Sequence, residues 1–135
     1  MYHTLTLVGN LGREPEMRYL PDGTAVTNLN IATNRSWNGS DGQKVSETTW
    51  FRVSVWGKQA EACNEYLQKG RRVLVEGRLK PDGNGGPRVF TRNDGTAGAS
   101  FEVTADKIVF LGGGNGNGQA ADSEPAAQEE DQIPF

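Results

Sequence analysis

Four Asp-Gly dipeptides divide the first part of this sequence into short segments that are rich in β-branched and aromatic residues. Asp-Gly supplies the positive φ angle that tight turns require, and such segments between turn signals are typical of strands. The dipeptides begin at Asp22, Asp41, Asp82 and Asp94. The strand-like segments are 5–8, 26–31, 50–56, 73–79 and 101–110. The pattern predicts an all-β protein with five strands.

Residues 58–69 break this pattern and predict a helix between the third and fourth strands. Ala60, Cys63 and Leu67 have helical spacing, and Gly70 stands where a helix C-cap belongs. Three strands, a helix and two strands are the order of the oligonucleotide-binding (OB) barrel, so we expect a five-stranded OB-fold barrel over 1–111. The segment 80–100 then forms a long Gly-rich loop between the fourth and fifth strands.

The composition changes after residue 111. All 14 Lys and Arg residues lie at or before Lys107, so 1–111 carries a net charge of +2 and the remainder carries −5. Residues 112–128 form a Gly-, Ala- and Gln-rich flexible linker, and 129–135 form an acidic tip; we expect this C-terminal tail to be disordered. An acidic segment beside a mildly basic domain is typical of interaction tails.

Two further features concern the compartment. Cys63 is the only cysteine, so no intramolecular disulfide forms, which suits a reducing compartment. We also find neither a signal peptide nor a membrane span at the start of the sequence. The expected location is the cytoplasm.

The third strand carries the clearest functional pattern. Strict alternation places Trp50, Arg52, Ser54 and Trp56 on one face and Phe51, Val53 and Val55 on the other. The apolar face is expected to point into the barrel, which leaves two tryptophans beside an arginine on the outside. Such a face suits base stacking at roughly 1–3 kcal/mol per base, with the arginine on a phosphate. Two alternatives remain: the face packs on a partner subunit, or a bulge turns one ring inward.

Aromatic residues near cations recur outside that strand. Trp37 is predicted near the tip of the loop between the second and third strands, and Phe90 lies between Arg88 and Arg92 in the long loop. Aromatic rings stack on any base and cations hold phosphates, so this combination favours single-stranded nucleic acid. Either ring could instead anchor its loop. The pair Arg71-Arg72 fits a phosphate contact or a solvated strand start.

The end of the sequence is a candidate partner-binding peptide. Ile133, Pro134 and Phe135 follow the acids Glu129, Glu130 and Asp131. We expect Phe135 to enter an apolar pocket of a partner, with its carboxylate and the acids on a basic rim. The alternative is a terminus without a role.

Motifs for catalysis and metal binding are missing from the sequence. It contains no nucleophile elbow, phosphate-binding GxxxxGK or HExxH pattern, and His3 has no metal-ligating neighbours at the required spacing. We therefore expect no enzymatic activity, no cofactor and no metal.

Several motifs resemble the bacterial single-stranded DNA-binding protein family. They are Leu7-Val8-Gly9-Asn10-Leu11-Gly12, Pro15-Glu16-Met17-Arg18-Tyr19, Trp50-Phe51-Arg52-Val53, Trp56-Gly57-Lys58, Glu65-Tyr66-Leu67-Gln68-Lys69-Gly70 and Asp131-Gln132-Ile133-Pro134-Phe135. The resemblance implies base stacking by Trp37, Trp50, Trp56 and Phe90, and basic positions near the DNA at Arg52, Lys58 and Lys69. It also implies a homotetramer in the nucleoid whose tip recruits replication, recombination and repair enzymes.

The sequence departs from that family at three places. Trp56 stands where many members have Phe, which preserves stacking, and the loop 80–100 is longer and richer in glycine. Gln132 stands where members commonly carry another acid, which bears on partner affinity.

The leading hypothesis is sequence-independent binding and protection of single-stranded DNA, without catalysis. The complete set of candidate DNA-binding residues is Trp37, Trp50, Arg52, Trp56, Lys58, Lys69, Arg71, Arg72, Arg88, Phe90 and Arg92. The candidate partner-binding residues are Asp131, Gln132, Ile133, Pro134 and Phe135. Two alternatives are a protein-interaction hub built on an OB scaffold and an RNA-binding OB module.

Overall fold

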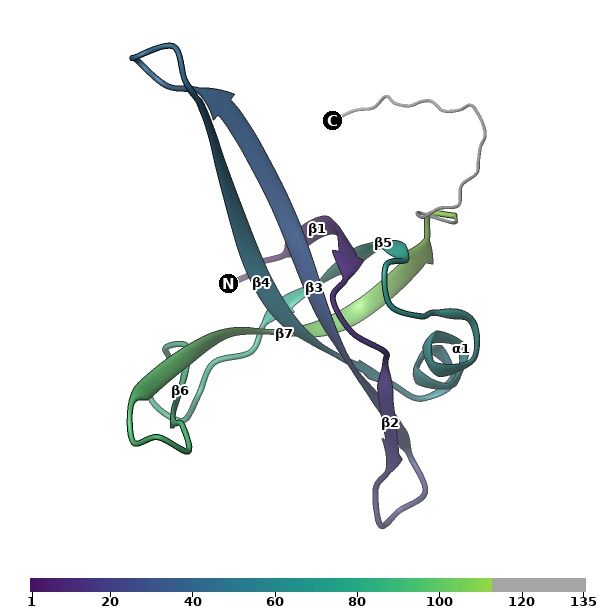
Figure 1. Cartoon of the computed structure of the whole chain (residues 1–135). Helices are drawn as coiled ribbons and strands as arrows, with labels where there is room; N and C mark the ends of the chain where they lie inside the picture. Colours follow the sequence, from purple (N-terminus) through teal and green to yellow (C-terminus); the bar gives the residue numbers. More distant parts are fainter. Residues whose placement is uncertain (113–135) are drawn as a thin grey trace.

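The computed structural model of the chain describes residues 1–112, which form seven strands and one helix (Figure 1). Their order is β1 (Leu5–Leu11), β2 (Glu16–Tyr19), β3 (Ala25–Asn38), β4 (Lys44–Trp56), α1 (Lys58–Tyr66), β5 (Arg72–Leu79), β6 (Arg88–Thr91) and β7 (Ala97–Phe110). The predicted linker beyond Gly112 and the acidic tip lie outside the described residues.

Five of these strands close into a barrel. They pair in the order β1-β5-β7-β4-β3, and β1 pairs again with β3 through Asn10 opposite Ala32 and Leu11 opposite Ile31, which closes the ring. All pairs are antiparallel except β4 with β7. This is the OB fold, and the predicted five-stranded barrel with a helix after its third strand is confirmed. The short strands β2 and β6, which extend β3 and β7, were not predicted.

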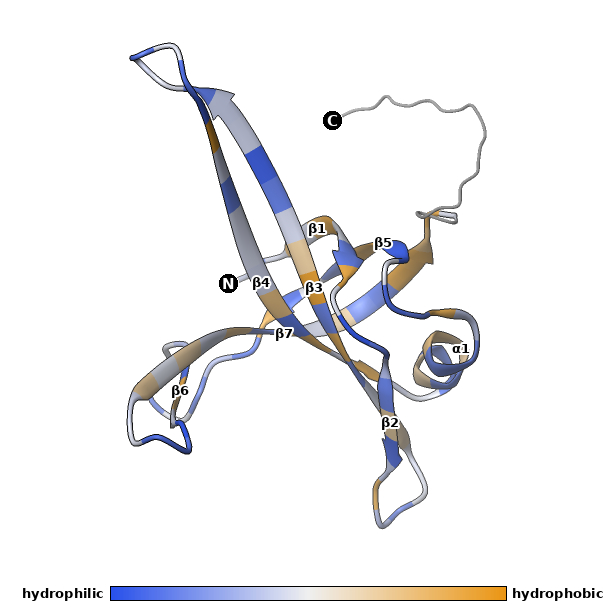
Figure 2. Ribbon diagram, in the orientation of Figure 1, coloured by the Kyte–Doolittle hydropathy of each residue, from blue (hydrophilic) through white to orange (hydrophobic). Residues whose placement is uncertain are grey.

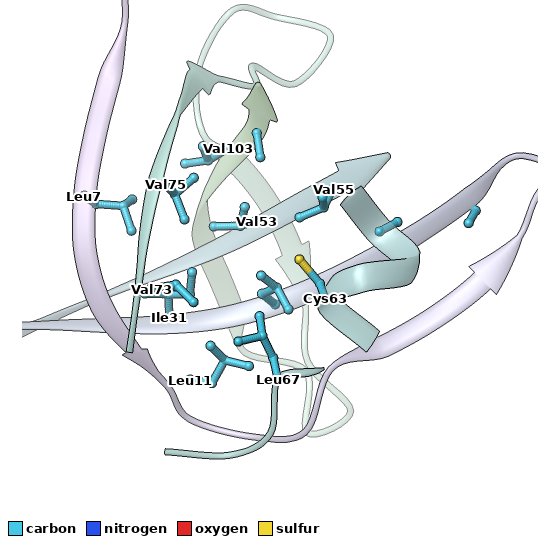
Figure 3. Close-up of a cluster of buried hydrophobic side chains, with 14 residues drawn as sticks. Leu7, Leu11, Ile31, Val53, Val55, Cys63, Leu67, Val73, Val75 and Val103 are labelled. Atoms are coloured by element: carbon cyan, nitrogen blue, oxygen red, sulfur yellow. The ribbon is translucent and has the colours of Figure 1, made fainter. Parts of the chain in front are cut away.

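The barrel interior is filled by aliphatic side chains from every barrel strand (Figure 3). Val53 and Val55 of β4 are fully buried, and Val73, Val75 and Val103 meet them from β5 and β7. The predicted alternation of β4 is therefore confirmed, since Trp50 and Trp56 on the opposite face are exposed. That division turns the aromatic face of β4 toward solvent.

Helix α1 ends three residues earlier than predicted. It ends at Tyr66 because Leu67 takes an extended conformation (φ −99°, ψ 150°) that buries its side chain in the core beside Cys63. Gly70 is therefore not the C-cap. It takes a positive φ of 92° in the following turn, where its N–H donates to the carbonyl oxygen of Leu11 at 2.8 Å. This bond ties the segment before β5 to the end of β1.

The β3–β4 hairpin extends well beyond the barrel (Figure 1). The sequence predicts that the second strand ends at Ile31 and that the third begins at Trp50. In the structure, the pairing of β3 with β4 continues without a break to Asn38 opposite Lys44. The distal part is mostly polar (Figure 2), and its one apolar pair, Trp37 opposite Val45, is too short to give the alternation that marks a half-buried strand. Trp37 consequently lies within β3 rather than in a loop.

The predicted loop 80–100 contains a second hairpin, β6–β7. Phe90 belongs to β6 and lies directly opposite Gly98 of β7, with Arg88 opposite Ser100. The turn after β6 closes through Asp94, whose side chain accepts the N–H of Thr96 at 3.0 Å. The hairpin carries Phe90 on an ordered strand, which the sequence pattern did not predict.

Candidate nucleic-acid interface

The outer face of β4 is an aromatic and cationic surface. Trp50 is 54 % exposed and Trp56 is 41 % exposed at the two ends of this face. Between them lies Arg52, whose neighbour Ser54 is nearly buried and donates its hydroxyl to Asn28 Oδ1 at 3.2 Å. The β3 residues opposite Trp50, Arg52 and Ser54 are small or polar, so the arginine and the indoles project beyond them.

A groove of about 480 Å³ brings this face together with the β6–β7 hairpin. We call it the central groove; its lining includes Trp50 and Arg52 from β4, Arg88 and Phe90 from β6, and Asn30 and Phe101. The two hairpins are about 40 residues apart in sequence, and the parallel pairing of β4 with β7 places them side by side. Two predicted aromatic residues and two predicted cations therefore share one groove.

Two smaller hollows adjoin the central groove, and Arg52 lines all three. One, of about 350 Å³, lies between Trp50 and Arg13. The other, of about 410 Å³, is lined by Arg18, Lys80 and Arg88. Arg13, Arg18 and Lys80 were not among the predicted site residues, because β2 and the ends of the long loop bring them to the site only in the folded chain. A continuous cationic path thus centres on Arg52.

Arg52 faces a buried carboxylate within this path. Its Nε lies 3.9 Å from Oε2 of Glu102, which is only 8 % exposed and also accepts the Ser100 hydroxyl at 2.7 Å. Residues 52 and 102 are opposite each other in the β4–β7 pairing, so the register fixes this contact. At 3.9 Å this contact is an ion pair and not a hydrogen bond, so it uses none of the five N–H donors of the guanidinium.

Phe90 is held between two guanidinium groups. The Cζ atoms of Arg88 and Arg92 lie 4.9 Å and 5.8 Å from the centre of its ring, within the range of cation–π attraction. Arg92 also donates to the carbonyl oxygen of Ala97 and, at 3.4 Å, to the Thr96 hydroxyl. The predicted grouping of Phe90 with two cations is therefore present on one face of the hairpin.

The structure does not bring Trp37 to the central groove. Trp37 is opposite Val45 and lies five residues beyond Ala32, the residue opposite Trp50, so it occupies the other face of the β3–β4 hairpin. Trp37 is 39 % exposed, and the Cζ atom of Arg35 lies 4.8 Å from the centre of its ring. Arg35 also forms an ion pair with Glu47, with 3.7 Å between Nη1 and Oε1. A strand that contacts both tryptophans has to pass around an edge of the hairpin.

The remaining predicted cations lie apart from the three hollows. Lys58 begins α1 and is exposed beside Trp56. Lys69 and Arg71 belong to the turn that contacts the end of β1, where the Lys69 N–H donates to Glu14 at 3.0 Å. Arg72 begins β5, and its Nε donates to Asn10 Oδ1 at 3.4 Å. None of these four residues lines the central groove or its two adjoining hollows.

The described residues contain neither a cluster of metal-ligating side chains nor an exposed cysteine. Residues 1–112 hold no group of three or more His, Cys, Asp or Glu side chains arranged for a metal ion. Burial raises the pKa of Cys63 to about 11, which keeps this thiol protonated at neutral pH. His3 accepts the N–H of Leu79 through Nε2 at 3.1 Å. Within the same residues no helix has the length and apolar character to span a membrane.

Comparison with known proteins identifies the family. Residues 2–111 match the model of the single-strand binding protein family. The chain belongs to the single-strand binding protein family. Proteins named single-stranded DNA-binding protein from Neisseria meningitidis serogroups A and B are 38 % identical to it over 118 residues. That match covers 87 % of this chain and 64 % of each relative, so the chain spans less than two thirds of their length.

Solved structures of the family have the same fold. A Plasmodium falciparum SSB in complex with ssDNA is 27 % identical, with a TM-score of 0.68 that covers 83 % of this chain and 97 % of that chain. A deletion mutant of the Thermus aquaticus single-stranded DNA binding protein is 32 % identical, with a TM-score of 0.62 over 82 % of this chain and 50 % of that one. The family resemblance expected from the motifs is confirmed.

Proposed function

We propose that this chain binds single-stranded DNA without sequence preference and protects it during replication, recombination and repair. The observation that carries the proposal is the central groove, in which Trp50 and Phe90 lie with Arg52 and Arg88. Aromatic faces stack on any base, and guanidinium groups bind any phosphate, so the combination is tolerant of sequence. The relatives' names and the Plasmodium complex with ssDNA support the same ligand.

The proposed path of the strand starts in the central groove and continues along the cationic hollows. Arg13, Arg18 and Lys80 supply further phosphate contacts there. Beyond them the remaining predicted residues extend the path: Trp37, Trp56, Lys58, Lys69, Arg71, Arg72 and Arg92. A strand covering these positions crosses both faces of the β3–β4 hairpin.

Titration with oligo(dT) tests the proposal. Tryptophan fluorescence is expected to be quenched as Trp50 stacks on bases, and Trp50→Ala is expected to weaken binding roughly 5-fold to 100-fold. Competition with an RNA strand of matched length separates the DNA-binding function from the RNA-binding alternative. Unquenched fluorescence together with unchanged affinity of the Trp50→Ala variant would falsify base stacking in this groove.

The proposal includes recruitment of partner enzymes by the segment 131–135. Its support is the sequence alone, in which Ile133, Pro134 and Phe135 follow a run of acids. Deletion of residues 131–135 is expected to abolish capture of replication and repair proteins and to leave DNA binding intact. Retention of those partners by the shortened chain would reject this role. Loss of DNA binding would show that the segment also takes part in binding DNA. The expected location is the cytoplasm, at the nucleoid.

Self-association into a homotetramer is also part of the proposal. The outer face of β1, β5 and β7 supports it, because Val8, Leu74 and Val109 are neighbours in the strand pairing and Val8 is exposed. An apolar stripe on an outer sheet face is a common oligomer contact. Light scattering on the purified protein is expected to give four subunits, and Val8→Lys is expected to lower that number. A monomeric wild-type protein would reject it.

A further inference from the structure

Two glycines lie directly against the two aromatic rings of the central groove. A Cβ atom on Gly12 would fall 2.5 Å from Cη2 of Trp50 and closer still to Cζ3. A Cβ atom on Gly98 would fall 2.8 Å from both Cε2 and Cζ of Phe90. Contacts this short essentially never occur, so any larger residue at either position displaces the ring. Each ring therefore rests against a glycine backbone.

Backbone conformation does not require glycine at these two positions. Neither Gly12 nor Gly98 belongs to the glycines with positive φ, such as Gly23 and Gly95 in the turns. Gly9 and Gly77 differ as well, because a Cβ atom there would meet the backbone carbonyls of Ala32 and Thr104. At Gly12 and Gly98 the nearest neighbours are side-chain atoms, with the aromatic ring nearest of all. The space beside Gly12 is thus used by the Trp50 ring, and the space beside Gly98 by the Phe90 ring and the Arg92 guanidinium.

The strand pairing explains how each ring reaches its glycine. Trp50 is opposite Ala32 of β3, and β3 pairs on its other side with the end of β1. Just after β1, the Gly12 N–H donates to the carbonyl oxygen of Asn30 at 2.9 Å. The indole therefore crosses β3 over a small residue and ends above Gly12. Phe90 is directly opposite Gly98 in the β6–β7 pairing, so its ring lies across the neighbouring strand.

This arrangement fixes the position of each ring in the groove that both rings line. The glycine leaves room for the ring, and a Cβ atom there would push the ring out of this position. A ring fixed in this way loses less side-chain entropy when a base stacks on it, because its rotamer is already restricted. Trp50 keeps more than half of its surface exposed in this position.

We propose that Gly12 and Gly98 are positioning residues for DNA binding, which leave the room that Trp50 and Phe90 need to take their places in the central groove. The inference rests on the proposed function of that groove. It assigns a role to two glycines through the side chains that they contact. The effect of Gly12 is transmitted through Trp50, and that of Gly98 through Phe90 and the neighbouring Arg92.

Double-mutant cycles test this role, with affinity for fluorescein-labelled oligo(dT) measured by anisotropy. Gly12→Ala is expected to weaken binding roughly 5-fold, since a tilted indole loses most of one stacking contact. In a Trp50→Ala background the same substitution is expected to have no further effect. Gly98→Ala and Phe90→Ala form the second cycle. Gly83→Ala is the matched control, because Gly83 has open space around it and no positive φ.

A rescue variant covers damage to the fold. If Gly12→Ala unfolds the protein or lowers its melting temperature sharply, replacing the indole by the smaller ring in Gly12→Ala/Trp50→Phe is expected to restore both folding and the affinity of Trp50→Phe alone. Full affinity of Gly12→Ala would overturn the role of Gly12. An equal loss in the Trp50→Ala background, or failure of the rescue, would overturn it as well.

A spectroscopic measurement separates this inference from the proposed function. In a Trp37→Phe/Trp56→Phe background the emission comes from Trp50, and Gly12→Ala is expected to increase its quenching by acrylamide as the indole is displaced from its contact with residue 12. If Trp50→Ala and Phe90→Ala both bind oligo(dT) normally, base stacking in the groove is wrong, and the quenching result still decides whether Gly12 holds the ring. Unchanged quenching would overturn the positioning itself.

Discussion

Arg52 and Glu102 lie opposite each other on the paired strands β4 and β7, with 3.9 Å between Nε and Oε2. The carboxylate is nearly buried, whereas the guanidinium side chain is 44 % exposed toward the groove. A negative charge therefore lies beside the cation that lines the central groove and both adjoining hollows. A phosphate that binds Arg52 has to compete with this carboxylate.

We expect Glu102→Gln to strengthen binding of single-stranded DNA, because the amide keeps an acceptor for the Ser100 hydroxyl and removes the competing charge. The expected gain is roughly 2-fold to 5-fold at low salt, from an ion pair worth about 0.5–1 kcal/mol, and it shrinks as salt rises. Anisotropy titrations at two salt concentrations measure it. Asp106→Asn is the control, since Asp106 pairs with Arg78 away from the three hollows. Weaker binding by Glu102→Gln would mean that the carboxylate holds Arg52 in its binding position.

The central position of Arg52 also predicts a change in salt dependence. Loss of one phosphate contact is expected to reduce the slope of log K against log salt by about 0.7 for a single strand. Arg52→Gln should therefore bind oligo(dT) more weakly and with a shallower slope than the wild-type protein. Arg78 is a cation outside the groove, so Arg78→Gln should leave the slope unchanged. A wild-type slope in Arg52→Gln would exclude Arg52 from the phosphate contacts.

The barrel could be predicted from the sequence because its signals are local. The alternation of Phe51, Val53 and Val55 against Trp50 and Trp56 defines the buried face of β4 without any tertiary information. The helix was placed correctly between two strands by its apolar spacing. The predicted end of the helix is wrong because Leu67 takes an extended conformation and packs into the barrel core. The position for this side chain exists only once the barrel has closed.

The groove itself could not be predicted, because it depends on pairing between distant segments. The parallel β4–β7 register places Arg52 against Glu102 and brings Phe90 near Trp50. The β3–β4 pairing places Trp37 on the other face of its hairpin, although the sequence pattern groups it with Trp50. The residue types in the sequence therefore indicate the chemistry of the site. The pairing of distant strands determines which of these side chains lie in the same groove.

A buried hydroxyl is expected to fix the helix to the barrel. Thr27 is fully buried and donates through Oγ1 to the carbonyl oxygen of Ala60 at 2.7 Å. Thr27→Val keeps the shape but removes the donor, so we expect a loss of about 1–3 kcal/mol in the free energy of unfolding. Urea unfolding measures this loss, and Thr91→Val, at an exposed position, should cost less than about 0.5 kcal/mol. An equal stability of the two variants would contradict the structural role of this bond.

Cys63 predicts a pH dependence at the alkaline end. Because burial raises its pKa from 9.0 to about 11, the folded protein binds the thiol proton more tightly than the unfolded chain. This contribution to stability is fully present below pH 9 and is lost as the pH rises through 11. Relative to Cys63→Ala, the wild-type protein should lose stability over that window. Modification by a thiol reagent at pH 8 should be about 100-fold slower in the native protein than in urea. Equal rates in the two states would show that Cys63 is accessible.

Asp82 predicts the corresponding behaviour at acid pH. Its Oδ1 accepts the backbone N–H groups of Asn84 at 2.8 Å and Gly86 at 3.1 Å, and these bonds lower the pKa of the carboxyl from 3.8. The ionised form therefore stabilises the turn after β5, and this contribution is present above pH 3.8 and lost as the pH falls through the lower folded value.

Asp82→Asn keeps a side-chain acceptor but cannot titrate. Its stability should therefore approach that of the wild-type protein as the pH falls from 5 to 2, when both are followed by thermal unfolding. The carboxyl carbon of Asp82, followed by NMR through the same range, should titrate below 3.8. A titration midpoint above 3.8 would show that the two N–H bonds are not formed in solution, and the turn that places Lys80 beside the groove would then need a different closure.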